Sequence, residues 1–386
     1  MQSQRREGEI LSGKRPDPIR RIDAASPIRR TSKAIHMSFS HFPAISRAEL
    51  VRRLGCMEQI GGAEVFTFAE GPARGMQAVC VRTGAGLSCQ VLTDRGMGLG
   101  EASIGGIPVS WLSAAGPVAP SYYNPSGSGW LQSFGGGLMT SCGLANVGTA
   151  STVDGIEIGL HGRLSHLPAR EVAVRRHWVD DRFVVDVSGV VRDVIAMGTA
   201  FELRRNYRFT IGENSFRISD EIVNIGAAAA PLFLLYHFNF GFPLLSETAE
   251  LDVTPPPVST SVRDPTQTAD IATWRHMTAP VAGIVERVFY HRLAPEAGET
   301  EVRLSNVVGD TRVIMTMHLP TAELGCLVEW KMMGERDYVL GIEPSNCFVA
   351  GRDAILAEGS AEILAPGALK TVDIDVGFDL APAKDA

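Results

Sequence analysis

Apolar and polar residues alternate along several stretches of the chain. In residues 371–380 every even position is apolar and no odd position is, and residues 216–222 show a similar alternation. Two further runs, 184–191 and 313–319, are rich in β-branched residues. A period of two places one face of a strand on a core and the other toward solvent or a cleft, as in antiparallel sheets. The pattern predicts an all-β fold, a large antiparallel β-sandwich with a few short helices.

One of those short helices is well marked. Ser46 and Glu49 have the spacing of a capping box, Leu50 and Leu54 form an i, i+4 apolar pair, and Gly55 follows as a stop signal. Three stretches depart from the strand pattern: residues 116–151, which are rich in glycine, serine and aromatic residues, residues 254–280, and residues 341–352. We interpret the first two as long structured loops, and such loops on a rigid scaffold often carry function.

Composition narrows the class of protein. The chain is 45% hydrophobic and 20% charged, which suits a globular protein with a large core, and its net charge of -7 argues against a nucleic-acid partner. The six cysteines show neither a CxxC pair nor zinc spacing, so we interpret them as reduced thiols of a cytoplasmic protein. The chain contains no apolar run long enough for a membrane helix, so we expect no membrane partner. Sheet edges would allow a homodimer without requiring one.

The first 36 residues differ from the rest of the chain. They contain nine basic and four acidic residues, a difference of +5, and little apolar content. We therefore expect residues 1–36 to be a disordered basic leader and residues 37–386 to form one β-sandwich domain. An extension from an upstream start codon explains the leader better than a transit peptide, because acidic residues are present and the amphipathic pattern is poor.

Two segments offer acid/base chemistry. His237 and Asn239 follow an apolar run and, on an alternating strand, share one face that ends at Gly241. Histidine is the side chain best suited to proton transfer near neutral pH, although a lone histidine is more often a buried structural residue. Glu343 stands directly before Pro344, which holds it extended and removes a ladder donor, so we expect the strand to end there at a sheet edge or mouth. The alternative for Glu343 is a surface acid beside a turn.

Further residues suit the binding of hydroxyl groups. His161 and Arg163 occupy alternate positions, and guanidinium offers several donors in a fixed fork. Arg95 lies in a charged turn, and Trp330 is a candidate platform for an apolar sugar face. The spacing of His161 and His166 fits neither a helical nor a same-face strand pair, so we expect no metal site. The sequence also lacks a GxSxG elbow, a phosphate-binding GxxxxGK[ST] loop, an HExxH motif, and a GxGxxG that opens a helix after a strand.

Taken in order, these segments resemble the aldose 1-epimerases (galactose mutarotases), and most closely an uncharacterised branch of that superfamily. The resemblance covers about residues 40–380 and is carried by Asp94-Arg95-Gly96-Met97, Phe134-Gly135-Gly136-Gly137-Leu138, His161-Gly162-Arg163, Tyr236-His237-Phe238-Asn239-Phe240-Gly241-Phe242-Pro243-Leu244-Leu245 and Gly341-Ile342-Glu343-Pro344-Ser345-Asn346-Cys347. The chain departs from the family after the histidine, where it reads Phe-Asn-Phe-Gly. The family's substrate-selecting aspartate has no evident counterpart.

The resemblance implies a galactose mutarotase-like supersandwich with a concave sugar-binding face. It implies an isomerase that interconverts anomers without metal or other cofactor, with His237 as the acid on the ring oxygen, Glu343 as the base on the anomeric hydroxyl, and His161 beside the ring oxygen. The candidate substrate-binding residues are Arg95, His161, Arg163, Asn239, Trp330 and Asn346. The expected partner is a small carbohydrate.

Two other classes of function stay open. The same scaffold could carry a lyase, a hydrolase, or an isomerase assisted by a metal at His161, His166 and Glu343. It could also bind or sense a sugar without catalysis, in which case binding would survive the loss of Glu343 as a base.

Overall fold

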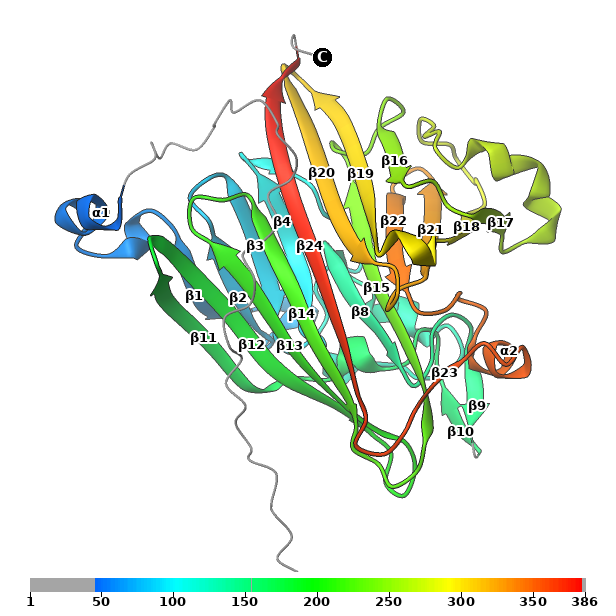
Figure 1. The fold of residues 1–386 in the computed structure, drawn as a ribbon. Coiled ribbons are helices and arrows are strands. Elements are labelled where there is room, and N and C mark those ends of the chain that lie inside the picture. The colour runs from blue at the N-terminus through cyan, green and yellow to red at the C-terminus, as the bar shows by residue number, and fades with distance from the viewer. Residues whose placement is uncertain (1–45, 154, 384–386) are drawn as a thin grey trace, which may run out of the picture.

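Two large antiparallel sheets face each other and form most of the molecule (Figure 1). This computed structural model describes residues 46–153 and 155–383, so the leader expected at residues 1–36 lies outside the described residues. The predicted antiparallel β-sandwich with few helices is confirmed. Within the described ranges, no helix has the length and apolar character needed to cross a membrane.

The first sheet has 12 strands and carries the candidate site. Its strands are β1 (Gly62–Thr67), β2 (Gln77–Arg82), β3 (Leu87–Leu92), β4 (Gly98–Ile104), β5 (Ile107–Pro108), β8 (Met139–Leu144), β15 (Ala230–Gly241), β17 (Ser259–Val262), β18 (Arg287–Arg292), β21 (Cys326–Met333), β22 (Tyr338–Ser345) and β23 (Glu362–Leu364). The main path runs β1-β2-β3-β4-β8-β15-β22-β21-β18-β17, while β5 pairs with β4 and β23 pairs with β15. Strands distant in sequence, such as β8, β15 and β22, thus become neighbours.

The second sheet has eight strands in the order β11-β12-β13-β14-β24-β20-β19-β16. Their bounds are β11 (Arg170–Val179), β12 (Arg182–Val194), β13 (Ala200–Thr210), β14 (Ser215–Asn224), β16 (Glu250–Thr254), β19 (Glu299–Val308), β20 (Thr311–Pro320) and β24 (Leu369–Pro382). Two further pairs are β6 (Trp111–Leu112) with β7 (Gly136–Gly137), and β9 (Ser151–Val153) with β10 (Ile156–Ile158).

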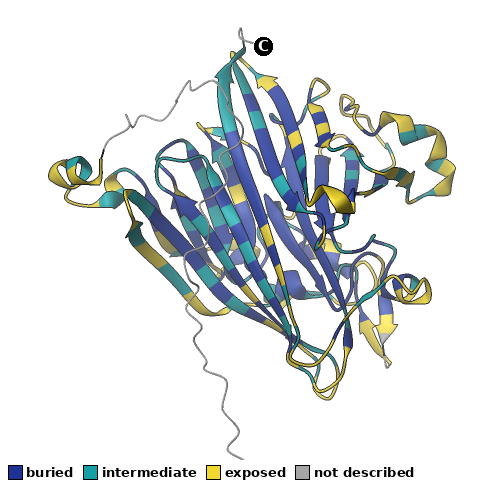
Figure 2. Cartoon of the chain, viewed as in Figure 1, coloured by how far each residue is buried: buried dark blue, intermediate teal, exposed yellow. Residues whose placement is uncertain are grey.

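The helices are short. The α-helices are α1 (Arg47–Arg53) and α2 (Arg352–Ala357), and the 3-10 helices are η1 (Met57–Gln59), η2 (Gly71–Ala73), η3 (Pro120–Tyr122), η4 (Gly129–Ser133), η5 (Leu164–His166), η6 (Pro265–Thr273) and η7 (Pro295–Ala297). Helix α1 confirms the capping prediction: the Ser46 hydroxyl accepts a hydrogen bond from the Glu49 N–H, and the Leu54 N–H donates to the Leu50 carbonyl. Neither α1 nor η6 buries a residue, whereas the strands are mostly buried (Figure 2).

The main core lies between the sheets. The alternation in residues 371–380 forms β24, whose Val372, Ile374, Val376 and Phe378 all belong to this core. The runs at 184–191, 216–222 and 313–319 form parts of β12, β14 and β20. Burying each such side chain removes apolar surface from water and is worth roughly 1.5–3 kcal/mol.

A buried ion pair within the eight-stranded sheet anchors a hydrogen-bond network behind the candidate site. The Arg205 guanidinium on β13 donates to both carboxylate oxygens of Asp220 on β14, at 2.7 and 2.5 Å. The Tyr236 hydroxyl on β15 donates to the same carboxylate at 2.7 Å, and Arg205 also donates to the Ser141 hydroxyl on β8. The network therefore links the eight-stranded sheet to the two strands that carry the site.

Three expectations about the irregular stretches need correction. Residues 139–144, expected within a loop, form β8 in the middle of the 12-stranded sheet, because small residues there hide the alternation of a fully buried strand. The stretch at 254–280 contains the edge strand β17 as well as η6. Strand β22 does end at Ser345, directly after Pro344, but it lies between β15 and β21 rather than at an edge.

Candidate active site

Strand β15 separates two environments by simple alternation. Tyr236 and Phe238 point into the core between the sheets, whereas Leu235 belongs to a second apolar cluster on the opposite face. His237 and Asn239 both lie on that opposite face with Leu235, and a shared face for His237 and Asn239 is what the sequence pattern predicted. The strand ends at Gly241, also as predicted.

The sheet register brings Glu343 beside His237. The pairs Leu235–Ser345 and Phe238–Ile342 join β15 to β22, and the same register between them places His237 opposite Glu343. His237 Nε2 lies 3.3 Å from Glu343 Oε1, and the two side chains are only 5% and 3% exposed. The structure thus joins the two predicted acid/base residues, which are 106 positions apart, across one strand pair.

The strand register extends the His237–Glu343 pair into a row of paired residues across the sheet. Thr140 of β8 pairs with His237, Glu343 pairs with Val328 of β21, and Val328 pairs with Tyr290 of β18. We call the side of the 12-stranded sheet that carries these five residues the site face. It is the side turned away from the core between the sheets.

Gly341 leaves the room that the Glu343 carboxylate occupies. It lies two residues before Glu343 on the same face of β22, opposite Trp330 of β21. A Cβ at this position would lie 2.6 Å from Glu343 Oε1 and 3.0 Å from the Cβ of Trp330. Any larger residue would displace the carboxylate or the indole.

Aromatic rings enclose His237. Ring centroids of Phe134, Trp330 and Trp130 lie 5.3, 5.5 and 6.4 Å from that of its imidazole. Phe134 and Trp130 come from the 116–151 stretch, and Trp111 packs against Phe134 at 5.7 Å. The predicted functional loop therefore covers the site face with apolar surface and keeps water from the acid/base pair.

His161 lies beside the same aromatic rings and has a strained backbone conformation. Its φ is 57°, a left-handed value that few non-glycine residues adopt, and its backbone N–H donates to the Gly148 carbonyl at 2.9 Å. Its Nδ1 accepts a hydrogen bond from the Gly148 N–H at 3.3 Å, so a neutral ring carries its proton on Nε2. The centroid of the His161 ring lies 5.7 Å from that of His237. Burial first, then the nearby His237 and Arg263, lower the pKa of His161 to about 3.

Burial sets the protonation of the pair. It lowers the pKa of His237 to about 4, because a charged imidazole would lose its hydration. Burial also raises the pKa of Glu343 well above its ordinary value, an effect that the nearby Glu286 carboxylate increases and the Arg263 guanidinium opposes. Both shifts favour the uncharged forms, an imidazole and a carboxylic acid, whose Nε2 and Oε1 lie 3.3 Å apart.

An ion pair that sequence reasoning missed flanks the site. Arg263 follows β17 and binds Glu286, which directly precedes β18. Glu286 also accepts a hydrogen bond from the Trp330 indole N–H at 2.7 Å, which fixes that ring beside His237. Neither residue carried a sequence signal, because Arg263 lies inside the stretch 254–280 and Glu286 beyond it, and only the order of β17, β18, β21 and β22 brings them beside the site.

Several buried polar atoms on or beside the site face have no hydrogen-bond partner among the described residues. They are His237 Nδ1, Asn239 Oδ1, Tyr290 Oη and Ser345 Oγ. Buried polar groups in proteins are nearly always satisfied, so a cluster of unsatisfied groups is typical of a ligand-binding face. No pattern in the sequence marks the Tyr290 or the Ser345 hydroxyl as a candidate.

The structure places three of the six candidate substrate-binding residues close to His237. They are His161, Trp330 and Asn239. The Asn239 amide donates to the carbonyls of His237 and Gly137, at 2.9 and 3.1 Å. Asn239 therefore braces the strand that carries His237, and its Oδ1 has no partner among the described residues.

The other three candidates make structural contacts elsewhere. Arg95 is buried and donates to the carbonyls of Val118 and Ser133. Arg163 binds the buried Asp193 carboxylate at 2.7 Å. Asn346 is likewise occupied, because its amide donates to the Leu232 carbonyl and the Glu362 carboxylate and accepts from the Leu234 N–H.

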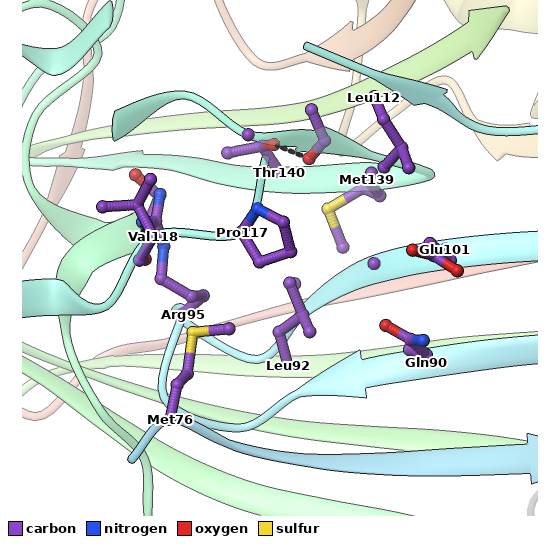
Figure 3. A pocket seen from close by; sticks show the side chains of 16 residues that line it. Met76, Gln90, Leu92, Arg95, Glu101, Leu112, Pro117, Val118, Met139 and Thr140 are labelled. Carbon is purple, nitrogen blue, oxygen red and sulfur yellow. Dashed lines mark hydrogen bonds between the residues drawn. The ribbon is translucent and has the colours of Figure 1, made fainter. Parts of the chain in front are cut away.

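A small cavity lies next to the site (Figure 3). Its lining includes Met76, Leu92, Met139, Arg95 and Thr140, but neither His237 nor Glu343. The Thr140 hydroxyl donates to the Gly136 carbonyl at 3.2 Å, as the dashed line shows. The cavity is mainly apolar and borders the acid/base pair across β8.

The residues considered for a metal do not converge. Both ring nitrogens of His166 are taken up by the hydroxyls of Ser133 and Ser165, at 2.7 and 3.0 Å. Throughout residues 46–153 and 155–383, the structure groups no three histidine, cysteine, aspartate or glutamate side chains in a way that could hold a metal ion. All six cysteines fall in these ranges and are free thiols.

Comparisons with known proteins agree with this architecture. The family model described as "Domain of unknown function (DUF4432)" matches residues 73–378. A crystal structure from Klebsiella pneumoniae, of a protein described as a "putative aldose 1-epimerase", is 25% identical, covers 83% of this chain and 86% of its own, and superimposes with a TM-score of 0.77. No protein among those with curated descriptions matches this sequence.

Two more distant structures share the fold alone. A galactose mutarotase-like protein from Clostridium acetobutylicum is 13% identical, covers 83% of this chain and 99% of its own, and has a TM-score of 0.51. Galactose 1-epimerase from Lactobacillus acidophilus is 13% identical, with the same coverage and a TM-score of 0.50. The predicted galactose mutarotase-like supersandwich is therefore confirmed.

Proposed function

The chain belongs to the DUF4432 family and has the galactose mutarotase-like fold, and from this premise we propose that it is an isomerase that interconverts the anomers of a sugar. One observation carries the proposal. His237 and Glu343 lie 3.3 Å apart on neighbouring strands, both nearly fully buried, with the rings of Phe134, Trp330 and Trp130 around the imidazole.

Anomer interconversion needs the proton balance that such a pair supplies. Ring opening removes the proton from the anomeric hydroxyl, forms the aldehyde, breaks the bond from the anomeric carbon to the ring oxygen and protonates that oxygen. Glu343 as carboxylate takes the first proton, and His237 as imidazolium gives the second. After rotation about the bond between carbons 1 and 2, the reverse transfers close the ring as the other anomer.

The resting protonation state fits this cycle. Transfer of the shared proton from Glu343 to His237 creates the reactive carboxylate and imidazolium without taking up or releasing a proton. Ring opening then returns the pair to its neutral form, with the proton on Glu343. The pair therefore works throughout the pH range in which it holds one proton in total.

The surrounding groups support a carbohydrate substrate. Aromatic rings such as Trp330 offer flat apolar surfaces for a sugar ring, and the His161 Nε2–H is a donor suited to the ring oxygen. Arg263 and Glu286 offer a donor and an acceptor for hydroxyl groups at the edge of the site. The proposal includes a cytoplasmic location and catalysis without a metal.

The test is a sugar panel followed by exchange NMR, which measures the rate between anomers at equilibrium. We expect at least one sugar to exchange faster with the enzyme than in buffer, and Glu343→Gln to abolish the acceleration. Glu64→Gln, which alters an exposed carboxylate on the edge strand β1, is the matched control and should leave the rate unchanged. Binding of a sugar without any accelerated exchange would instead favour a sugar-binding or sensing protein.

A further inference from the structure

A closed ring of hydrogen bonds lies behind the aromatic wall of the site. The Trp130 indole N–H donates to the Ser165 hydroxyl at 2.9 Å, and Ser165 Oγ lies 3.0 Å from His166 Nδ1. His166 Nε2 lies 2.7 Å from Ser133 Oγ, and the Ser133 hydroxyl donates to the Trp130 carbonyl at 3.3 Å. The chain of bonds begins and ends on the same tryptophan.

Chemistry fixes the direction of the two bonds at the ends of this ring. The indole N–H can only donate and the carbonyl can only accept. Ser165 therefore accepts from Trp130, and its own proton is available to His166 Nδ1 when that ring is neutral with its proton on Nε2. The Ser133 hydroxyl donates its proton to the Trp130 carbonyl and accepts a hydrogen bond from His166 Nε2–H. A neutral His166 with its proton on Nε2 satisfies all four bonds of the ring at once.

The surroundings of His166 maintain that neutral state. The side chain is buried, and the Tyr123 ring stacks on it with centroids 4.3 Å apart. Burial first, then the Arg95 guanidinium, lower the pKa of His166 to about 2. The Ser133–His166 contact is not a nucleophile and base, because Ser133 has no exposed surface and its proton is already donated to a carbonyl.

The other side of Trp130 faces the candidate site. Its ring lies 5.0 Å from that of His161 and 6.4 Å from that of His237, and it stacks on Phe134 at 4.4 Å. The indole therefore joins the hydrogen-bonded ring to both histidines of the site. Its angle decides how closely these histidines are packed and how well water is excluded.

We infer that His166 is a positioning residue that, through Ser133 and Ser165, holds the Trp130 indole as a fixed wall against the histidines of the site. The catalytic consequence of this role depends on the proposed function, whereas the positioning itself does not. His166 touches no reacting atom.

Two substitutions of His166 by amide side chains test the two halves of the hydrogen-bonded ring separately. In His166→Asn the amide oxygen can replace Nδ1 and accept from Ser165, whereas in His166→Gln the amide nitrogen can replace Nε2–H and donate to Ser133. The readout is the exchange of the Trp130 indole proton with water, followed by ¹H–¹⁵N NMR and assigned by the peak that Trp130→Phe removes. We expect slow exchange in the wild type and in His166→Asn, and faster exchange in His166→Gln and in Ser165→Ala.

The controls keep the inference falsifiable. His177→Gln, at a half-exposed histidine on β11, should leave the indole signal unchanged. Ser165→Ala removes only a hydroxyl, so it tests the role even if the His166 variants do not fold. With the sugar identified by the panel, His166→Gln should lower kcat roughly 10-fold with little change in KM, as substitutions of orienting partners do.

Slow indole exchange in all folded variants would overturn the inference, whatever the enzyme does with sugars. Faster exchange with an unchanged kcat would overturn the catalytic consequence of the positioning. The exchange experiment needs no substrate, so a chain without mutarotase activity would still report on the positioning. Failure of the proposed function and failure of this inference are therefore distinguishable.

Discussion

Replacing Gly341 by alanine should disable the site by moving one carboxylate. The added Cβ would lie 2.6 Å from Glu343 Oε1, whereas ordinary contact begins at 3.4 Å. Restoring that separation requires a shift of about 0.8 Å, from 3.4 minus 2.6, and the Trp330 side chain at 3.0 Å blocks part of the space. The backbone of Gly341 is not in the left-handed region, so the effect is purely steric.

The expected loss follows from this displacement. Misplacing a catalytic group by about 1 Å can cost on the order of 100-fold in rate, so we expect the anomer exchange rate of Gly341→Ala to fall by about that factor. Overpacking of a buried site costs about 1–3 kcal/mol in the free energy of unfolding. Urea unfolding measures that cost, and exchange NMR on the folded variant measures the rate.

Gly55→Ala is the matched control, because a Cβ there meets no atom within 4 Å. It should leave both the rate and the stability near those of the wild type. If Gly341→Ala folded with full stability and kept the wild-type rate, the Glu343 carboxylate would not need the position described here, and the geometric reasoning would be refuted.

Three further predictions concern charge. Burial lowers the pKa of His237 to about 4, so the pair takes up a second proton only near that pH. We therefore expect kcat to stay constant from pH 7 to pH 5. A fall in kcat centred near pH 6.5 would instead mean that the pKa of this histidine is not shifted. Glu286→Gln removes a charge that raises the pKa of Glu343, so the alkaline limb of the pH–rate profile should move to lower pH, and an unmoved limb would show that the charge is not felt. Asp220→Asn leaves its buried guanidinium partner uncompensated and should cost about 3–5 kcal/mol in urea unfolding, whereas a loss below 1 kcal/mol would contradict the described pair.

Strand periodicity predicted much of the fold because strands of the eight-stranded sheet have one face on the core and the other face less buried. In β14 buried and half-buried positions alternate along the whole strand, and in β24 the sequence alternates apolar and polar residues from 371 to 380. Strand β8 is buried along its whole length and contains small residues, so its sequence has no period to detect. A strand covered on both faces looks like a loop when its side chains are small.

The candidate site was predictable only in part, for a related reason. His237 and Glu343 stand out locally, one by the alternation of β15 and the other by Pro344. Arg263 and Glu286 carry no local signal, because their place beside the site depends on the order of β22, β21, β18 and β17. Sheet order is a long-range property, and a single sequence does not display it.

Residue type alone also misled the choice of binding residues. Arginine suits hydroxyl recognition, but Arg95 donates its hydrogen bonds to backbone carbonyls and Arg163 donates to the buried Asp193 carboxylate. Asn346 similarly ties β22 to β15 through backbone groups. Which donors remain free for a ligand is decided by tertiary packing, and the sequence pattern around these residues is the same in either case.

The most direct test of the acid/base pair is a double-mutant cycle on His237 and Glu343. Each single variant, His237→Asn or Glu343→Gln, should lower the enzyme-catalysed anomer exchange rate by about 10²–10⁴-fold. Because the two groups act as one unit on one shared proton, the double variant should lose little more than the worse single variant. Losses that multiply, or a single variant that keeps the wild-type rate, would contradict a coupled pair.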